Sequence, residues 1–152
     1  MNQRLPIRPY EAWPSRLAAE IERLAIDPAL LGQLRVRGLE NFGQGGCAIL
    51  AEAIRRALGP RARLVGIREA DYPFIEHLVV ECEGWYLDAN GVRSQPDFLE
   101  YVRSIGGYRE PVLVDFGPHR ATHNMLPYPA SERLVAGLAA RLTQAARGGH
   151  TH

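Results

Sequence analysis

The chain has 152 residues, of which 46% are hydrophobic and 23% are charged, a composition typical of one ordinary globular domain. All 18 basic residues are arginine, and 17 acidic residues bring the formal net charge to +1. Schiff-base chemistry needs a lysine amine and is therefore excluded. The arginines are spread from Arg4 to Arg147. The near-neutral charge and the even spread of arginines argue against nucleic acid as a partner, because proteins that bind nucleic acid carry a cationic excess or a clustered basic face.

Cysteine content and hydropathy bear on the compartment. Two cysteines, Cys47 and Cys82, are too few for a disulfide framework, which favours a reducing compartment. Pro6, Pro9 and Pro14 interrupt the N-terminal segment, and no apolar stretch approaches the roughly 18 residues of a membrane span. We expect a cytoplasmic protein with no membrane partner, while secretion by a specialised, signal-free route stays open.

The N-terminal third of the chain has a helical pattern. In the first 42 residues, apolar side chains recur every three or four positions in two groups separated by Asp27-Pro28, which predicts two supporting helices. The glycine-rich segment NFGQGGC follows, and Cys47 then opens a third helix with a broad apolar face. Gly59-Pro60 supplies the cap and the stop for this helix.

Beyond residue 61 the apolar period changes from 3.6 to 2, which predicts strands. The expected strands span residues 62–67, 76–82 and 85–89, with Glu83-Gly84 as a two-residue turn between the last two. A short helix should run from Gln95-Pro96 to Gly106-Gly107, and a further strand over 112–116. The remainder of 108–130 contains several prolines and predicts loop.

The C-terminal end predicts one more helix. Ser131 can cap a helix over residues 133–148, and residues 148–152 have no packing pattern and predict a disordered tail. We therefore expect a single α+β domain over residues 1–147, with a helix packed on a small antiparallel sheet and flanked by further helices.

Cys47 is the candidate nucleophile. It follows Gly45-Gly46 at the start of a helix, where free backbone N–H groups and the helix dipole favour a thiolate. The glycines also allow a sharp turn that leaves room for a substrate carbonyl.

The predicted hairpin supplies a base and a carboxylate. If Glu83-Gly84 is the turn, Cys82 pairs with Trp85 and Val79 with Asp88. Because side chains alternate, His77 and Asp88 then share one face as diagonal neighbours about 7–8 Å apart between backbones. Cys82 lies on the opposite, apolar face and is expected to be a buried structural thiol.

These residues resemble a known superfamily. The run CAILAEAIRRALGPRARLVGI followed by EHLVVECEGWYLDANG is similar to the core of papain-like and transglutaminase-like cysteine enzymes, over residues 41–91. In size and in its GGC pattern the chain is most similar to small bacterial papain-like proteins, including toxin and effector domains with deamidase or peptidase activity. The resemblance implies a Cys-His-Asp triad of Cys47, His77 and Asp88 and no cofactor.

The same resemblance bears on the oxyanion hole. Papain-like enzymes have a glutamine six residues before the cysteine, where this chain has Asn41, while Gln44 lies three residues before. Either amide can help to form an oxyanion hole, with Gln44 preferred. The transglutaminase pattern also has an aromatic residue and a proline where this chain has Val79 and Ala89, which weakens the case for transglutamination but leaves the triad intact.

The resulting hypothesis is acyl transfer from an amide, by a peptidase, amidase or glutamine deamidase acting on a protein or peptide. The alternative is a catalytically silent domain that binds a peptide or partner protein through the same cleft. His119 and His123 lie four residues apart in a proline-rich loop without an evident third ligand, so no metal site is expected. Tyr72-Pro73-Phe74 precedes the histidine strand and fits either a cleft border or surface packing.

Overall fold

The computed structural model describes residues 12–43, 46–116 and 132–148. These residues form five α-helices, a short 3-10 turn (Gly59–Arg61) and five strands. The helices are α1 (Ala12–Ala25), α2 (Pro28–Val36), α3 (Cys47–Leu58), α4 (Gln95–Ser104) and α5 (Glu132–Ala146). The strands are β1 (Ala62–Glu69), β2 (His77–Cys82), β3 (Trp85–Asp88), β4 (Gly91–Ser94) and β5 (Pro111–Asp115).

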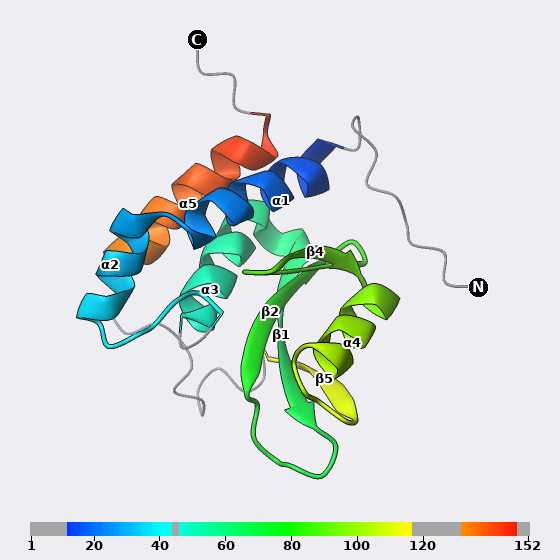
Figure 1. The fold of residues 1–152 in the computed structure, drawn as a ribbon. Coiled ribbons are helices and arrows are strands. Elements are labelled where there is room, and N and C mark those ends of the chain that lie inside the picture. The colour runs from blue at the N-terminus through cyan, green and yellow to red at the C-terminus, as the bar shows by residue number, and fades with distance from the viewer. Residues whose placement is uncertain (1–11, 44–45, 117–131, 149–152) are drawn as a thin grey trace.

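The strands form one antiparallel sheet in the order β4-β3-β2-β1-β5. Strands β1 to β4 follow one another as a meander, and α4 then carries the chain from one edge of the sheet to β5 at the other edge (Figure 1). The expected α+β class and antiparallel sheet are confirmed. The β5 strand lies within one residue of its predicted bounds.

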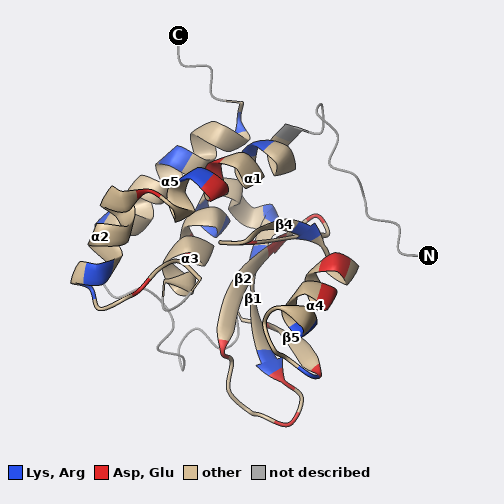
Figure 2. Cartoon of the chain, in the orientation of Figure 1, with Lys and Arg blue, Asp and Glu red and all other residues tan. Residues whose placement is uncertain are grey.

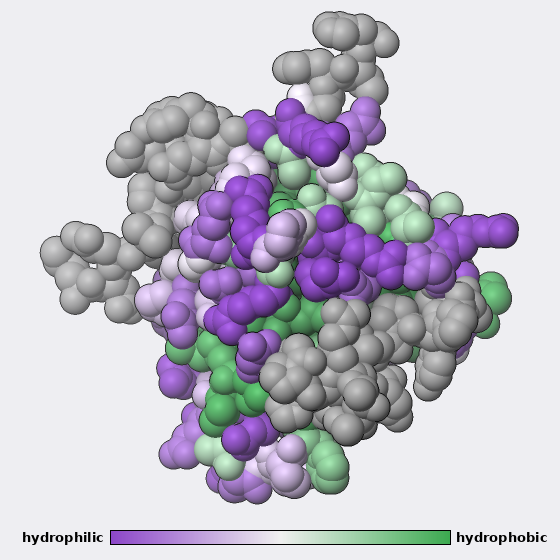
Figure 3. All heavy atoms as spheres, turned by 180° about the vertical axis from the view of Figure 1, so that it is seen from behind, coloured by the Kyte–Doolittle hydropathy of each residue, from purple (hydrophilic) through white to green (hydrophobic). Residues whose placement is uncertain are grey.

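Helix α3 lies between the sheet and the other helices. It packs against β1, β2 and β3 on one side and against α5 on the other, and α1 packs on α5 (Figure 1). Helix α4 covers the opposite face of the sheet, where Tyr86 stacks on Phe98 with ring centroids 5.1 Å apart. Arginine and acidic positions are scattered over the helices, the ends of the strands and the loops (Figure 2). The view from behind likewise shows many hydrophilic residues, with hydrophobic ones between them (Figure 3).

The burial of α3 exceeds what its sequence pattern predicted. Its described side chains are buried from Cys47 to Ile54, including Glu52 at 2% exposure. Glu52 accepts hydrogen bonds from Arg55 and is also paired with Arg56. A carboxylate this deeply buried is tolerated because the two guanidinium groups, both of which contact its Oε1, compensate its charge.

The β2–β3 hairpin forms as predicted. Cys82 pairs with Trp85 and Val80 with Leu87, and the two turn residues Glu83 and Gly84 have φ angles of 54° and 86°, as a type I′ turn requires. The register is the predicted one, but the β2–β3 ladder ends at the Val80–Leu87 pair, so the expected pairing of Val79 with Asp88 is absent. Asp88 pairs with Gly91 on the β4 side of the strand.

Strand β4 (Gly91–Ser94) is a correction to the sequence analysis, which predicted no strand there and extended the preceding one to Ala89. The segment GVRS contains one large apolar residue, too few for a period to be detected. It is a strand because the tight turn at Asp88–Gly91 returns the chain alongside β3.

Within the described residues no helix is long and apolar enough to cross a membrane. In the same part of the chain no group of three or more His, Cys, Asp or Glu side chains is placed to hold a metal ion. His119, His123, the Ser131 cap and residues 149–152 lie outside the described residues.

Candidate active site

Cys47 is the first residue of α3, and a close backbone approach fixes its position. The Gly46 N–H donates to the Asn41 carbonyl at 2.9 Å, and a Cβ at Gly46 would lie 2.6 Å from the same oxygen. Only glycine fits there without displacing the backbone. Gly46 is the N-cap of α3 and makes no side-chain hydrogen bond to the helix. The N–H groups of the first helical turn therefore donate no hydrogen bond to a capping side chain.

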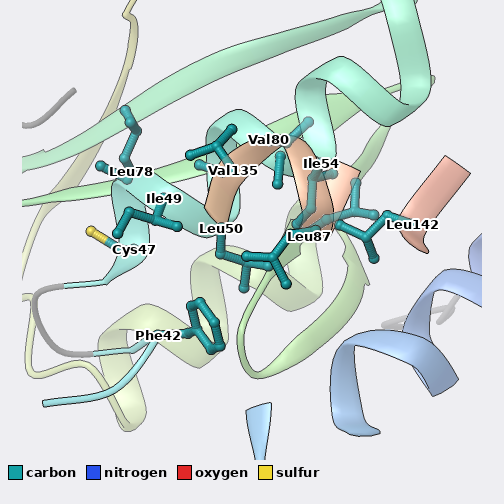
Figure 4. Close-up of a cluster of buried hydrophobic side chains, with 14 of the residues drawn as sticks. Phe42, Cys47, Ile49, Leu50, Ile54, Leu78, Val80, Leu87, Val135 and Leu142 are labelled. Atoms are coloured by element: carbon teal, nitrogen blue, oxygen red, sulfur yellow. The ribbon is translucent and has the colours of Figure 1, made fainter. Parts of the chain in front are cut away.

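The thiol of Cys47 lies at the margin of the hydrophobic core. Cys47 is 9% exposed. Figure 4 shows it at one end of the buried cluster, with its sulfur directed away from Leu50 and Phe42. Cys82, by contrast, is fully buried on the α3 side of the sheet, and burial raises the pKa of its thiol to about 11. The structure therefore confirms the predicted buried position of Cys82.

His77 and Asp88 meet at the end of the sheet that faces Cys47. His77 is the first residue of β2 and Asp88 the last residue of β3. The Nε2 atom of His77 lies 3.8 Å from Oδ2 of Asp88, and the two side chains are 19% and 5% exposed. The pairing across the hairpin thus places these two residues together, as the predicted register requires.

The carboxylate of Asp88 has two partners. Its Oδ1 accepts the Asn90 N–H at 2.8 Å, while Oδ2 faces His77. The sequence alone left open whether Asp88 caps its own turn or orients the histidine. The structure assigns one oxygen to each contact, and the cap holds the carboxylate in the orientation that faces the imidazole.

The three side chains shift one another's protonation. Burial of Cys47 raises the pKa of its thiol, but hydrogen bonding to His77 and the charge of the imidazole, helped by the Leu78 and Ala48 N–H groups, bring that pKa below its ordinary value. Burial lowers the pKa of His77, yet Asp88 and then Cys47 outweigh it and raise that pKa to about 9. Both directions favour a thiolate–imidazolium pair over the neutral thiol and imidazole.

A narrow depression contains all three groups. It is lined by Phe42, Cys47, Leu50, Ala51, His77, Leu78, Leu87, Asp88 and Ala89. Apolar side chains on most sides lower the local dielectric, which strengthens the interactions among the charged groups. The Leu78 N–H beside the thiol was missed by the sequence analysis, because no side-chain pattern reports where a backbone amide points.

The structure describes only one of the two side-chain amides that the sequence proposed for an oxyanion hole. Asn41 uses its Oδ1 to accept the Gly43 N–H at 2.8 Å and thereby shapes the turn that precedes Cys47. Gln44 lies outside the described residues.

The comparisons with known proteins found no relative: no family model, no curated protein and no solved structure matches the chain. The chemistry of the site has to be argued from its own geometry.

Proposed function

We propose that this chain is a cysteine-dependent acyl-transfer enzyme acting on amides, with Cys47 as nucleophile, His77 as acid and base, and Asp88 as the group that orients the imidazole. The observation that carries the proposal is the convergence of these three side chains, from α3, β2 and β3, in one depression. Three such groups are what a triad mechanism needs.

In the proposed reaction the Cys47 thiolate attacks the amide carbonyl carbon and forms a C–S bond, and the π electrons of the carbonyl move to its oxygen. As the tetrahedral intermediate collapses, the C–N bond breaks and the His77 imidazolium gives its proton to the leaving nitrogen. Neutral His77 then removes a proton from water, and the hydroxide oxygen displaces the thiolate from the thioester. An amine leaving group gives a peptidase or amidase, and ammonia from a glutamine side chain gives a deamidase.

The proposed substrate is a protein or peptide, and the proposed compartment is the cytoplasm, because both cysteines are free thiols and reduced thiols persist in reducing compartments.

The low exposure of Cys47 favours a second candidate. This is the catalytically silent domain, in which the depression only binds a peptide or partner protein and the thiol has ordinary reactivity.

The rate of Cys47 alkylation by iodoacetamide between pH 4.5 and 10, in a Cys82→Ala background, separates these functions. We expect the midpoint of the rate to lie below 9, the ordinary value for a thiol, and His77→Gln to move it upward, because the imidazole lowers the pKa of Cys47. Glu100→Gln, at an exposed position on α4, is the matched control and should leave the midpoint unchanged. A midpoint near 9 that is indifferent to His77→Gln overturns the triad and leaves the silent domain.

A further inference from the structure

The loop between β1 and β2 carries a pair of exposed aromatic rings. Tyr72 is 45% and Phe74 59% exposed, and their rings meet edge to face with centroids 5.5 Å apart. The other large exposed apolar residues in the described part of the chain, Ile26, Val36 and Ile105, lie singly at helix ends. Single exposed apolar side chains are ordinary on a protein surface, whereas the Tyr72–Phe74 pair forms a contiguous apolar patch, which is typical of a binding site.

One side of this loop is fixed by a single arginine. The Arg68 guanidinium donates to the carbonyl oxygens of Glu69, Ala70 and Tyr72 at 3.0, 3.3 and 3.4 Å. The Tyr72 N–H also donates to the Glu69 carbonyl at 3.1 Å. These bonds hold the backbone under the first ring of the pair.

The loop is also anchored on both flanks. Oxygens of the Glu69 carboxylate accept the N–H groups of Arg109 and Glu110 at 2.7 and 3.0 Å. At the other end the buried Ile75 packs so closely on Gly66 that a Cβ there would lie 2.7 Å from it. Hydrogen bonds and packing therefore hold the backbone that carries the two exposed rings. Binding of a ligand to the rings then costs little loop entropy, because the loop is already ordered.

The position of the pair relates it to the active site. Phe74 is three residues before His77, so the two backbones lie at most about 11 Å apart. The loop extends from the end of the sheet where β2 begins (Figure 1). An extended polypeptide spans this distance in about three residues.

The acidic residues near the pair indicate a second feature of the ligand. Glu76 is exposed between Phe74 and His77, and Asp71 on the same loop is 74% exposed, with Arg109 3.5 Å away. The surface between the pair and the site thus carries a carboxylate, which complements a basic side chain on a bound polypeptide.

We propose that the Tyr72–Phe74 pair is a substrate subsite, which binds an apolar side chain of a polypeptide about three residues from the acyl group that reacts with Cys47. This rests on the proposed function and narrows its substrate to a polypeptide with an apolar residue at that distance, preferably with a basic residue in between. The subsite selects the substrate, and the triad performs the reaction.

Peptide chloromethyl ketones of glycine test the subsite in a Cys82→Ala background. Two probes are compared, which carry either leucine or glycine at the position three residues before the reacting carbonyl. We expect the leucine probe to alkylate Cys47 about tenfold faster than the glycine probe. Phe74→Ser should reduce that ratio about five- to tenfold, since it removes one aromatic contact. Ile26→Ser, which removes an apolar side chain that is even more exposed than Phe74, is the control and should leave the ratio unchanged.

The outcomes separate the subsite from the proposed function. A ratio below twofold in the parent protein, or one that Phe74→Ser leaves unchanged, overturns the subsite. Ordinary iodoacetamide reactivity overturns the triad instead, and the probe ratio is then still measured at pH 9.5, where the thiol ionises in any case. Sedimentation provides a further check: a dimer that Phe74→Ser dissociates would show that a second copy covers the pair, which also overturns the subsite.

Discussion

Replacement of Asp88 by asparagine isolates the charge of the carboxylate from its role in the turn. Oδ1 of Asp88 accepts the Asn90 N–H, and Oδ2 faces His77. Asparagine retains an acceptor for the Asn90 N–H but places a neutral amide nitrogen opposite the imidazole. Asp88→Asn should therefore fold normally and lose the electrostatic support of the imidazolium.

The expected magnitude follows from the pKa of His77. Its rise from 6.5 to about 9 corresponds to about 3 kcal/mol of preference for the imidazolium. Burial opposes that rise, and Asp88 is the largest contribution in its favour, ahead of Cys47. Asp88→Asn should therefore lower the pKa of His77 by at least about one unit, or about 1.4 kcal/mol. The pKa of Cys47 should rise in turn, because the imidazolium that stabilises the thiolate becomes less populated.

The assay is an NMR titration of the imidazole resonances, with the His77 signals identified by their loss in His77→Gln. Asp71→Asn, at the exposed aspartate of the β1–β2 loop, is the matched control and should leave the His77 titration unchanged. A His77 pKa in Asp88→Asn within about 0.3 units of the parent value would refute the reasoning, since the carboxylate would then contribute less than about 0.4 kcal/mol.

The pH dependence of the free energy of unfolding gives a second measurement, and the raised pKa of His77 determines its direction. Because the folded-state pKa of His77 is raised, its contribution to stability is fully present below pH 6.5 and is lost as the pH rises through about 9. The difference in the free energy of unfolding between the parent protein and Asp88→Asn should be largest near pH 6 and should shrink by pH 10. A difference that is constant over this range would assign the effect to packing.

Three further outcomes are expected. Gly46→Ala should lower the free energy of unfolding by about 1–3 kcal/mol in urea denaturation, because its Cβ would clash with the Asn41 carbonyl; an unchanged midpoint would contradict this. Cys82→Ala should leave the alkylation rate of Cys47 unchanged, because Cys82 is fully buried on the core side of the sheet. Arg93 donates to the Asn90 carbonyl at 3.1 Å and lies over the Tyr101 ring, so Arg93→Ala should loosen the turn and lower the pKa of His77 by a few tenths of a unit. Loss of its charge alone would raise that pKa, and the sign seen in the NMR titration decides between the two.

The hairpin was predictable because a local rule determines it. Two residues between alternating apolar runs fix the register of an antiparallel pair, and Glu83-Gly84 does so here. The register then fixes which side chains share a face. For this reason the approach of His77 to Asp88 was predicted from spacing alone and is found in the structure.

The surroundings of α3 were not predictable in the same way. Its apolar pattern predicts one buried face, yet both the sheet and α5 pack on it. Helix α5 begins 74 residues after α3 ends, and no local pattern states which distant element covers the second face. Glu52 is buried beside its arginine partners because of this packing. The sequence pattern does not predict that burial.

The positions of the three proposed triad residues explain why substitutions there should act on stability through the pKa values of the site. Cys47 begins α3, His77 begins β2 and Asp88 ends β3, so each lies where the repeating backbone pattern stops. At such ends, backbone N–H groups have no partner within the element, and here they serve the site: N–H groups lower the pKa of Cys47 and hold the Asp88 carboxylate. The same elements bury their interior residues in the core. Substitutions inside the elements should therefore change the free energy of unfolding at every pH, whereas substitutions at these three ends should change it in step with the pKa values of the site.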